Sequence, residues 1–194
     1  MNISGITWRG ESIQDVELLP DLPLDLLGLL TKTNGFILHN GALHVRGACL
    51  NPEWHSLRQA WFGPDSFSKL YKEVEATDIP FAEDQFGDQF LMRNGGVFRL
   101  ETETGQVQPL CESLQIFLSR VEEDIVTFLN VGLNHPLEPG QLLHAYPPFC
   151  VESKSGVSLK PCPASEVILF HADLARQIRD VPDGMNIEFK IKDP

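Results

Sequence analysis

Residues 79–110 contain four short runs of strand-forming residues separated by turn formers, and this pattern constrains the fold more than any other in the chain. The runs read IPF, QFLMR, GVFRLE and QVQPL. The separators are Phe86-Gly87-Asp88, Asn94-Gly95-Gly96 and Glu103-Thr104-Gly105. Aromatic and β-branched residues favour strands, whereas Gly, Asn and Asp favour the tight turns between them. The segment therefore predicts an antiparallel meander.

The clearest helical pattern of the chain follows directly, over residues 113–129. Its apolar residues recur with i, i+3 and i+4 spacing: Leu114, Phe117, Leu118, Val121, Ile125 and Phe128. We expect this helix to begin at about Ser113 and to end near Gly132. Strands and helices come in blocks rather than in strict alternation, so the expected class is α+β with an antiparallel sheet.

The remaining segments are expected to complete one domain with an extension. Residues 1–17 are predicted to form an N-terminal flap or edge segment, residues 18–133 the α+β domain, and residues 134–194 a C-terminal extension packed on the same domain. The local expectations are a helix over 21–33, a hairpin turn at Asn40-Gly41, two short helices within 51–75, an ordered loop over 134–150, a helix over 164–180 and an edge strand carrying Ile187, Phe189 and Ile191.

Charge and composition restrict the function classes. The chain has 27 Asp and Glu against 15 Lys and Arg, a net charge of −12, which repels nucleic acid and anionic lipid. It has no apolar run of the ~20 residues that a membrane span needs, and no basic leader typical of a signal peptide. The four cysteines (Cys49, Cys111, Cys150 and Cys162) form no CxxC pair and are expected to be reduced thiols. We therefore expect a cytoplasmic protein without a nucleic-acid or membrane partner.

The stretch FAEDQFGDQF, residues 81–90, concentrates the carboxylates Glu83, Asp84 and Asp88. A calcium loop needs oxygen ligands at fixed positions, and the spacing here does not match. An acid pair for acid–base catalysis and a catalytic Cys–His pair stay open as alternatives, but no local signature supports either. The six histidines form no HxH or HExxH motif. We therefore predict no catalytic residue, no metal and no cofactor, and expect that the protein is not an enzyme.

A cluster of aromatic residues precedes this acidic stretch. Trp54 and Trp61 lie among five aromatic residues between positions 54 and 71, and packing in the core explains most of them. If one or two were exposed beside the acids, they would form an aromatic anchor with an acidic rim, as in protein-binding patches. The candidate partner-binding residues are Trp54, Trp61, Glu83, Asp84, Gln85 and Asp88.

The order of these motifs resembles the SUKH superfamily, which includes the yeast cell-wall-synthesis regulator and many bacterial immunity proteins. The resemblance covers roughly residues 18–130 and rests on LPLDLLGLLTKTNGF, GALHVRGA, DIPFAEDQFGDQFLMRNGGVFRLETETGQVQPL and ESLQIFL. It implies a single α+β domain with a curved antiparallel sheet flanked by helices. It also implies a non-enzymatic role, because the family's functional unit is a binding face. The matched positions are Asn34, Gly35, Gly41, Pro80, Asp84, Gly87, Asp88, Gly96 and Gly105.

The leading functional hypothesis is a protein-binding module of the SUKH type, as a monomer or weak homodimer. One version is an immunity protein that neutralises a cationic toxin domain such as a nuclease, since an acidic protein is steered toward a cationic partner. Two alternatives remain: a housekeeping regulatory or scaffold protein, and a hydrolase that uses the acids of residues 83–88.

Overall fold

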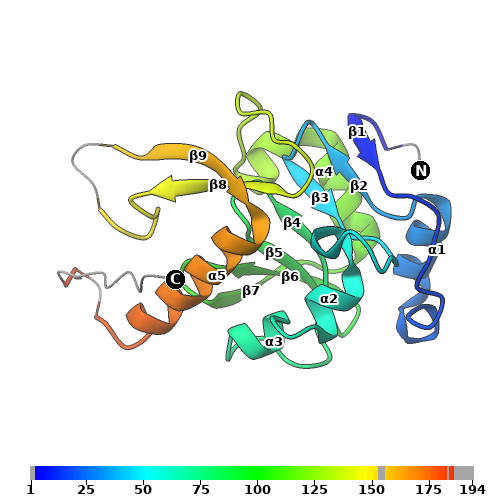
Figure 1. Ribbon diagram of the computed structural model, residues 1–194, viewed down its shortest axis with the longest axis horizontal. Coiled ribbons are helices and arrows are strands. Elements are labelled where there is room, and N and C mark those ends of the chain that lie inside the picture. The colour runs from blue at the N-terminus through cyan, green and yellow to red at the C-terminus, as the bar shows by residue number, and fades with distance from the viewer. Residues whose placement is uncertain (1–2, 153–155, 183, 186–194) are drawn as a thin grey trace.

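The computed structural model describes residues 3–152, 156–182 and 184–185, and its main element is a seven-stranded antiparallel sheet (Figure 1). Each strand pairs with the next one along the chain, so the sheet is a continuous meander. The strands are β1 (Ile6–Arg9), β2 (Phe36–Leu38), β3 (Leu43–Val45), β4 (Ile79–Asp84), β5 (Gln89–Arg93), β6 (Gly96–Glu101) and β7 (Gln106–Cys111). The expected antiparallel meander and the α+β class are confirmed.

Helices occupy both sides of this sheet, and a two-stranded sheet of β8 (Gln141–Tyr146) and β9 (Ser158–Pro163) projects beside it (Figure 1). The helices are η1 (Leu19–Asp21), α1 (Leu24–Lys32), η2 (Glu53–His55), α2 (Leu57–Phe62), α3 (Phe67–Leu70), α4 (Leu114–Leu129) and α5 (Ala164–Ile178). No helix in the described ranges combines the length and apolar character needed to cross a bilayer.

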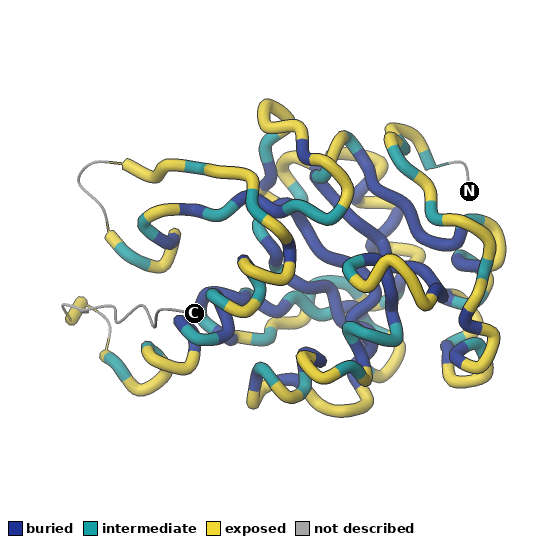
Figure 2. Tube along the Cα trace, viewed as in Figure 1, coloured by how far each residue is buried: buried dark blue, intermediate teal, exposed yellow. Residues whose placement is uncertain are grey.

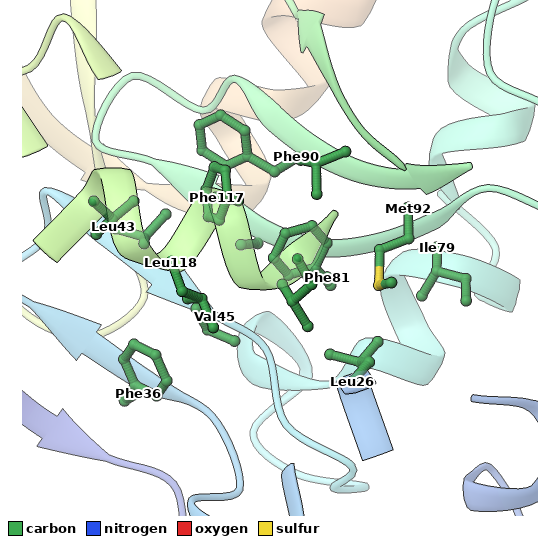
Figure 3. Packing of buried hydrophobic residues seen from close by; sticks show 14 of the residues in the cluster. Leu26, Phe36, Leu43, Val45, Ile79, Phe81, Phe90, Met92, Phe117 and Leu118 are labelled. Atoms are coloured by element: carbon green, nitrogen blue, oxygen red, sulfur yellow. The ribbon is translucent and has the colours of Figure 1, made fainter. Parts of the chain in front are cut away.

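One face of the sheet packs against α4 and α1 and forms the main core (Figure 3). The Phe117 ring of α4 lies edge-on to Phe81 at 5.5 Å and tilted against Phe90 at 4.9 Å. Leu26 and Leu30 supply the apolar stripe of α1. The strands are buried along most of their length in the centre of the sheet (Figure 2).

The opposite face has two different halves. Over β5 and β6, Leu91 and Leu100 pack against Phe67 of α3 and against Tyr71, the residue that follows α3. They also pack against Ala172 of α5. Over β3 and β4, the same face carries His44, Arg46 and Glu83 instead of apolar side chains, because neighbours on a strand alternate between faces. Only the first half therefore offers a surface on which a helix can pack tightly.

The C-terminal segment packs on two turns of the sheet, the β4–β5 turn and the β2–β3 turn. The Leu143 N–H donates to the carbonyl of Gln85 at 2.8 Å, and the Leu137 N–H to that of Asn40, also at 2.8 Å. At Gly87, where φ is +90°, a Cβ atom would lie 3.1 Å from Leu142 Cδ1. The turn that contains Gly87 therefore combines a left-handed backbone with a close approach by β8.

Several local expectations need correction. Residues 134–150 are mostly loop, as expected, but they also contain the strand β8; their prolines lie outside the paired residues 141–146. The helix expected from residue 65 onward is only the four residues of α3. Ser113 caps α4 as expected, but Asn130, in the left-handed conformation, ends it instead of Gly132. The strand expected at Ile187, Phe189 and Ile191 lies outside the described residues.

Replacement of Phe117 tests the main core. Phe117→Ala leaves a cavity between α4 and the sheet, because the ring is fully buried against three other phenylalanines. We expect the free energy of unfolding to fall by about 3–5 kcal/mol in urea denaturation. Ile116→Ala, on the exposed side of the same helix turn, is the matched control and is expected to cost less than about 1 kcal/mol. Equal losses in the two variants would contradict this packing.

Candidate functional site

Glu83 lies at the centre of a buried polar network on the second face of the sheet. The strand register places His44 opposite Glu83 on one side and Gln89 opposite it on the other. Arg46 lies two residues beyond His44 and therefore shares its face. All four side chains are buried; three come from the adjacent strands β3, β4 and β5, and Arg46 directly follows β3.

The Glu83 carboxylate accepts hydrogen bonds at both oxygens. His44 Nδ1 lies 2.9 Å from Oε1, while Arg46 Nη2 and Gln89 Nε2 donate to Oε2 at 2.7 and 3.2 Å. Burial opposes ionisation of this carboxyl, but Arg46 and His44 outweigh it and lower the pKa of Glu83 to about 2. Glu83 is therefore a carboxylate at neutral pH, compensated inside the protein and not by solvent.

The network continues through two histidine rings to the backbone at Asn34. His44 Nε2 lies 2.9 Å from His55 Nδ1, and His55 Nε2 lies 3.0 Å from the Asn34 carbonyl oxygen. Burial lowers the pKa of His55 to about 3. Burial acts to lower the pKa of His44, whereas the hydrogen bond to Glu83 and the charge of that carboxylate act to raise it.

The His55 ring is held by close backbone contacts that only glycine allows. A Cβ atom at Gly10, Gly35 or Gly47 would clash with the ring. Trp54 covers the other side of the network, with its ring 5.1 Å from that of His44 and 5.4 Å from that of His55. The two histidines therefore have little freedom to rotate away from their partners.

A cavity of about 560 Å³ lies above this network, between η2, α2 and α3 on one side and the start of α5 on the other. Buried Arg46 and Glu83 reach its floor, and Trp54 and Phe67 contribute aromatic surface. The exposed carboxylates Glu53 and Asp65 lie at its rim. The other lining residues are Asn51, Pro52, Gln59, Ala60, Pro64, Gly140, Pro163, Ala164, Ser165, Ile168 and Leu169.

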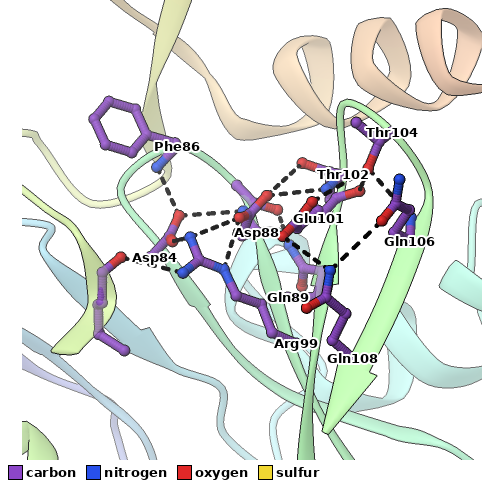
Figure 4. Close-up of polar contacts among 12 residues, drawn as sticks. Asp84, Phe86, Asp88, Gln89, Arg99, Glu101, Thr102, Thr104, Gln106 and Gln108 are labelled. Carbon is purple, nitrogen blue, oxygen red and sulfur yellow. Dashed lines mark hydrogen bonds and ion pairs between the residues drawn. The ribbon is translucent and has the colours of Figure 1, made fainter. Parts of the chain in front are cut away.

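A second network fixes the turn of the 81–90 stretch (Figure 4). Asp84 Oδ1 accepts from the N–H groups of Phe86 and Asp88 at 2.9 and 3.1 Å. Arg99 donates to Asp84 Oδ2 at 3.2 Å and, through Nε, to Asp88 Oδ2 at 2.8 Å. Burial and the neighbouring Asp88 raise the pKa of Asp84, and Arg99 opposes that shift. Arg99 is thus the counter-charge for both carboxyls.

This second network also ties the sheet to the C-terminal segment. The hydroxyl of Thr102 donates to Asp88 Oδ1 at 3.2 Å and therefore accepts from the Nδ1–H of His171 on α5, at 3.0 Å. Glu103 accepts from the N–H groups of Phe149 and Cys150 at 3.1 and 2.8 Å. The acids after β4 and β6 thus anchor the segment that covers them.

The structure corrects the expected acidic rim. Glu83, Asp84 and Gln85 are only 2%, 0% and 2% exposed, because the C-terminal segment and the sheet enclose them. Trp61 is also buried, and its indole N–H donates to the Ala76 carbonyl at 2.9 Å.

Of the candidate residues, Trp54 alone both lines the cavity and retains partial exposure; Asp88 is half-buried in its ion pair with Arg99. Sequence reasoning missed His44, Arg46 and His55 as one group. The alternation of His44, Val45 and Arg46 was the available signal, since it places two polar side chains on one face of a strand. The partner strand that faces them could not be read from that alternation.

Two further features bear on the chemistry. In the described ranges, no group of three or more His, Cys, Asp or Glu side chains is arranged to hold a metal ion. The four cysteines are free thiols. Burial raises the pKa of Cys150 to about 12 and that of Cys49 to about 11, so neither is a ready nucleophile at neutral pH.

Together, these features define an α+β protein with a meander sheet, a buried ion network on one face and a cavity over that network. Searches against protein-family models, curated proteins and solved structures found no match to the chain.

Replacement of Arg99 tests the second network. Arg99→Met removes the counter-charge of the buried Asp84 and the half-buried Asp88 but keeps much of the side-chain volume. We expect the free energy of unfolding at pH 7 to fall by about 3 kcal/mol in urea denaturation. The matched control is Arg9→Met on exposed β1, which is expected to change stability by less than about 0.5 kcal/mol. If Arg99→Met lowered the free energy of unfolding no more than the control does, Arg99 would not be needed to balance the charges of Asp84 and Asp88.

The buried His171 predicts acid destabilisation. Burial, assisted by His144, lowers the pKa of His171 to about 4, below the ~6.5 of a free histidine. As pH falls below 6.5 the unfolded chain binds a proton that the folded protein excludes, so stability present above 6.5 is lost down to about pH 4.

Between pH 6.5 and about pH 4, we expect the free energy of unfolding of the unmodified protein to fall by about 3 kcal/mol more than that of His171→Gln. The exposed His135→Gln variant is the control and is expected to follow the unmodified protein at every pH. If the free energies of unfolding of His171→Gln and of the unmodified protein changed with pH in parallel, His171 would not be the cause of the acid destabilisation.

Proposed function

We propose that the protein is a non-enzymatic binding module that recognises another protein through the rim of the cavity between the sheet and the C-terminal segment. The observation that carries the proposal is the arrangement of this cavity: aromatic and proline surface inside, with the exposed acids Glu53 and Asp65 outside. Apolar anchor sites surrounded by charged rims are typical of protein interfaces.

The charge distribution favours a cationic partner. The rim acids add to a net charge of −12, which accelerates association with a positively charged surface. The resemblance of residues 18–130 to the SUKH superfamily supports the same class of function. A toxin domain that must hold nucleic acid is cationic, so we propose neutralisation of such a domain in the cytoplasm as the specific form of this activity, with regulation of an endogenous protein as the alternative.

The hydrolase alternative is less well supported. Neither Asp84 nor Asp88 lines the cavity, and both are engaged with Arg99. Glu83 reaches the cavity floor next to His44, which is the one observation in favour of catalysis. Both of its carboxylate oxygens already accept hydrogen bonds from within the protein, so this group is better suited to holding the fold than to transferring protons.

Charge reversal at the rim tests the proposal. The purified protein is titrated against the products of the genes adjacent to its own, including any cationic toxin domain, by biolayer interferometry at low and moderate salt. We expect Glu53→Lys/Asp65→Lys to slow association with the partner about tenfold or more, because the rim charges guide the encounter.

The control is Glu122→Lys/Glu123→Lys, which changes the net charge equally but lies on exposed positions of α4. If both double variants slowed association equally, the effect would come from the overall charge, and the cavity rim would not be the binding site. An absence of binding to every adjacent gene product would count against the toxin-neutralising form.

A further inference from the structure

The chain of contacts from Asn34 through His55 and His44 to Glu83 requires one more proton than two neutral histidines can supply. The chain contains three close contacts, at 3.0, 2.9 and 2.9 Å. Each hydrogen bond needs one hydrogen. The atoms at the two ends, the Asn34 carbonyl oxygen and the Glu83 carboxylate, only accept, and two neutral imidazoles provide only two N–H groups.

The position of the missing proton follows from the same contacts. The Asn34 carbonyl requires a hydrogen on His55 Nε2, so a neutral His55 presents the lone pair of Nδ1 to His44. His44 must then donate through Nε2 to His55, and through Nδ1 to the ionised Glu83. A histidine that donates from both nitrogens is an imidazolium.

We propose that the folded protein binds this third proton at His44 at neutral pH, and that the Asn34–His55–His44–Glu83 chain is a built proton-binding site. Without it, two acceptor atoms would face each other inside the protein at hydrogen-bond distance. The rings cannot turn away, because backbone at three glycines encloses His55, and His44 is packed against Trp54. The proposal is independent of the protein-binding function.

Burial works against a charged His44, and the surrounding charges decide the outcome. The charged groups that act on the two rings are Glu83 and Arg46, and His44 also acts on His55. Arg46 opposes the proton, but it is itself paired with Glu83 and with the Pro80 carbonyl at 2.9 Å. Glu83 accepts directly from His44, so a hydrogen-bonded anion at the shortest range opposes the cost of desolvating the cation.

The extra proton gives the floor of the cavity a net positive charge. Arg46 and Glu83 both line the cavity, and protonated His44 lies directly behind Glu83. With His44 protonated, the three groups carry two positive charges and one negative charge. The cavity then combines a positive floor with the negative rim at Glu53 and Asp65, and loss of the proton at high pH would remove that contrast.

Nitrogen-15 NMR of the histidine rings tests the inference on the unmodified protein. At pH 7.5, where a free histidine is mostly neutral, we expect both ring nitrogens of His44 to be protonated and His55 to carry hydrogen on Nε2 alone. Two neutral rings at that pH, each with a single N–H, would overturn the proposal. This measurement needs no variant.

Glu83→Gln provides the matched variant. The amide nitrogen of glutamine can donate to His44 Nδ1 while its oxygen accepts from Arg46, so two neutral rings satisfy all three contacts and the total charge of the cluster is unchanged. We expect the titration midpoint of His44 to fall in this variant, because the carboxylate that favours its proton is gone. An unchanged midpoint in a folded Glu83→Gln protein would contradict the inference, and His135→Gln, on an exposed loop, controls for the effect of substitution itself.

Discussion

The ion pair between Glu83 and Arg46 is the interaction on which the arrangement of the second sheet face depends. A carboxylate at the centre of a seven-stranded sheet has almost no access to water, so its charge must be balanced within the protein. Arg46, His44 and Gln89 provide that balance because the register of β3, β4 and β5 brings them to the same face. A one-residue slip in either strand pairing would move them to the apolar face. The network and the register therefore specify each other.

The C-terminal segment has a structural role in this arrangement. It covers the β4–β5 turn through β8, and α5 contributes His171 to the hydrogen bonds that begin at Asp88. Glu103 extends the same connection to the backbone of Phe149 and Cys150. The acids that made the 81–90 stretch conspicuous are therefore mostly internal supports for a layer that arrives from the end of the sequence. Because they are buried, the surface that a partner can reach consists of Trp54 and the cavity rim.

Local patterns predicted the fold well and the site poorly, for one physical reason. Turn residues such as Gly87 and Asp88 predict the meander. The spacing of apolar residues within a few positions, as around Phe117, predicts α4 and α5. The site depends on contacts between residues 11 to 39 positions apart, such as His44 with His55 and with Glu83. The burial of Glu83 and Asp84 cannot be read from local sequence either, because β8, which packs on the turn after them, begins 57 residues after Asp84.

The two halves of the second sheet face explain why a cavity exists at this position. Over β5 and β6, Leu91 and Leu100 present apolar surface, and α3 and α5 pack on it closely. Over β3 and β4, the same face presents His44, Arg46 and Glu83, whose hydrogen bonds are already directed within the sheet and toward His55. Apolar helix residues would not stabilise such a surface, because they cannot form hydrogen bonds with its polar side chains. The cavity lies over this polar half, between α2 and α3 on one side and the start of α5 on the other. Its location is a consequence of the polar network, and a partner that enters it meets the network first.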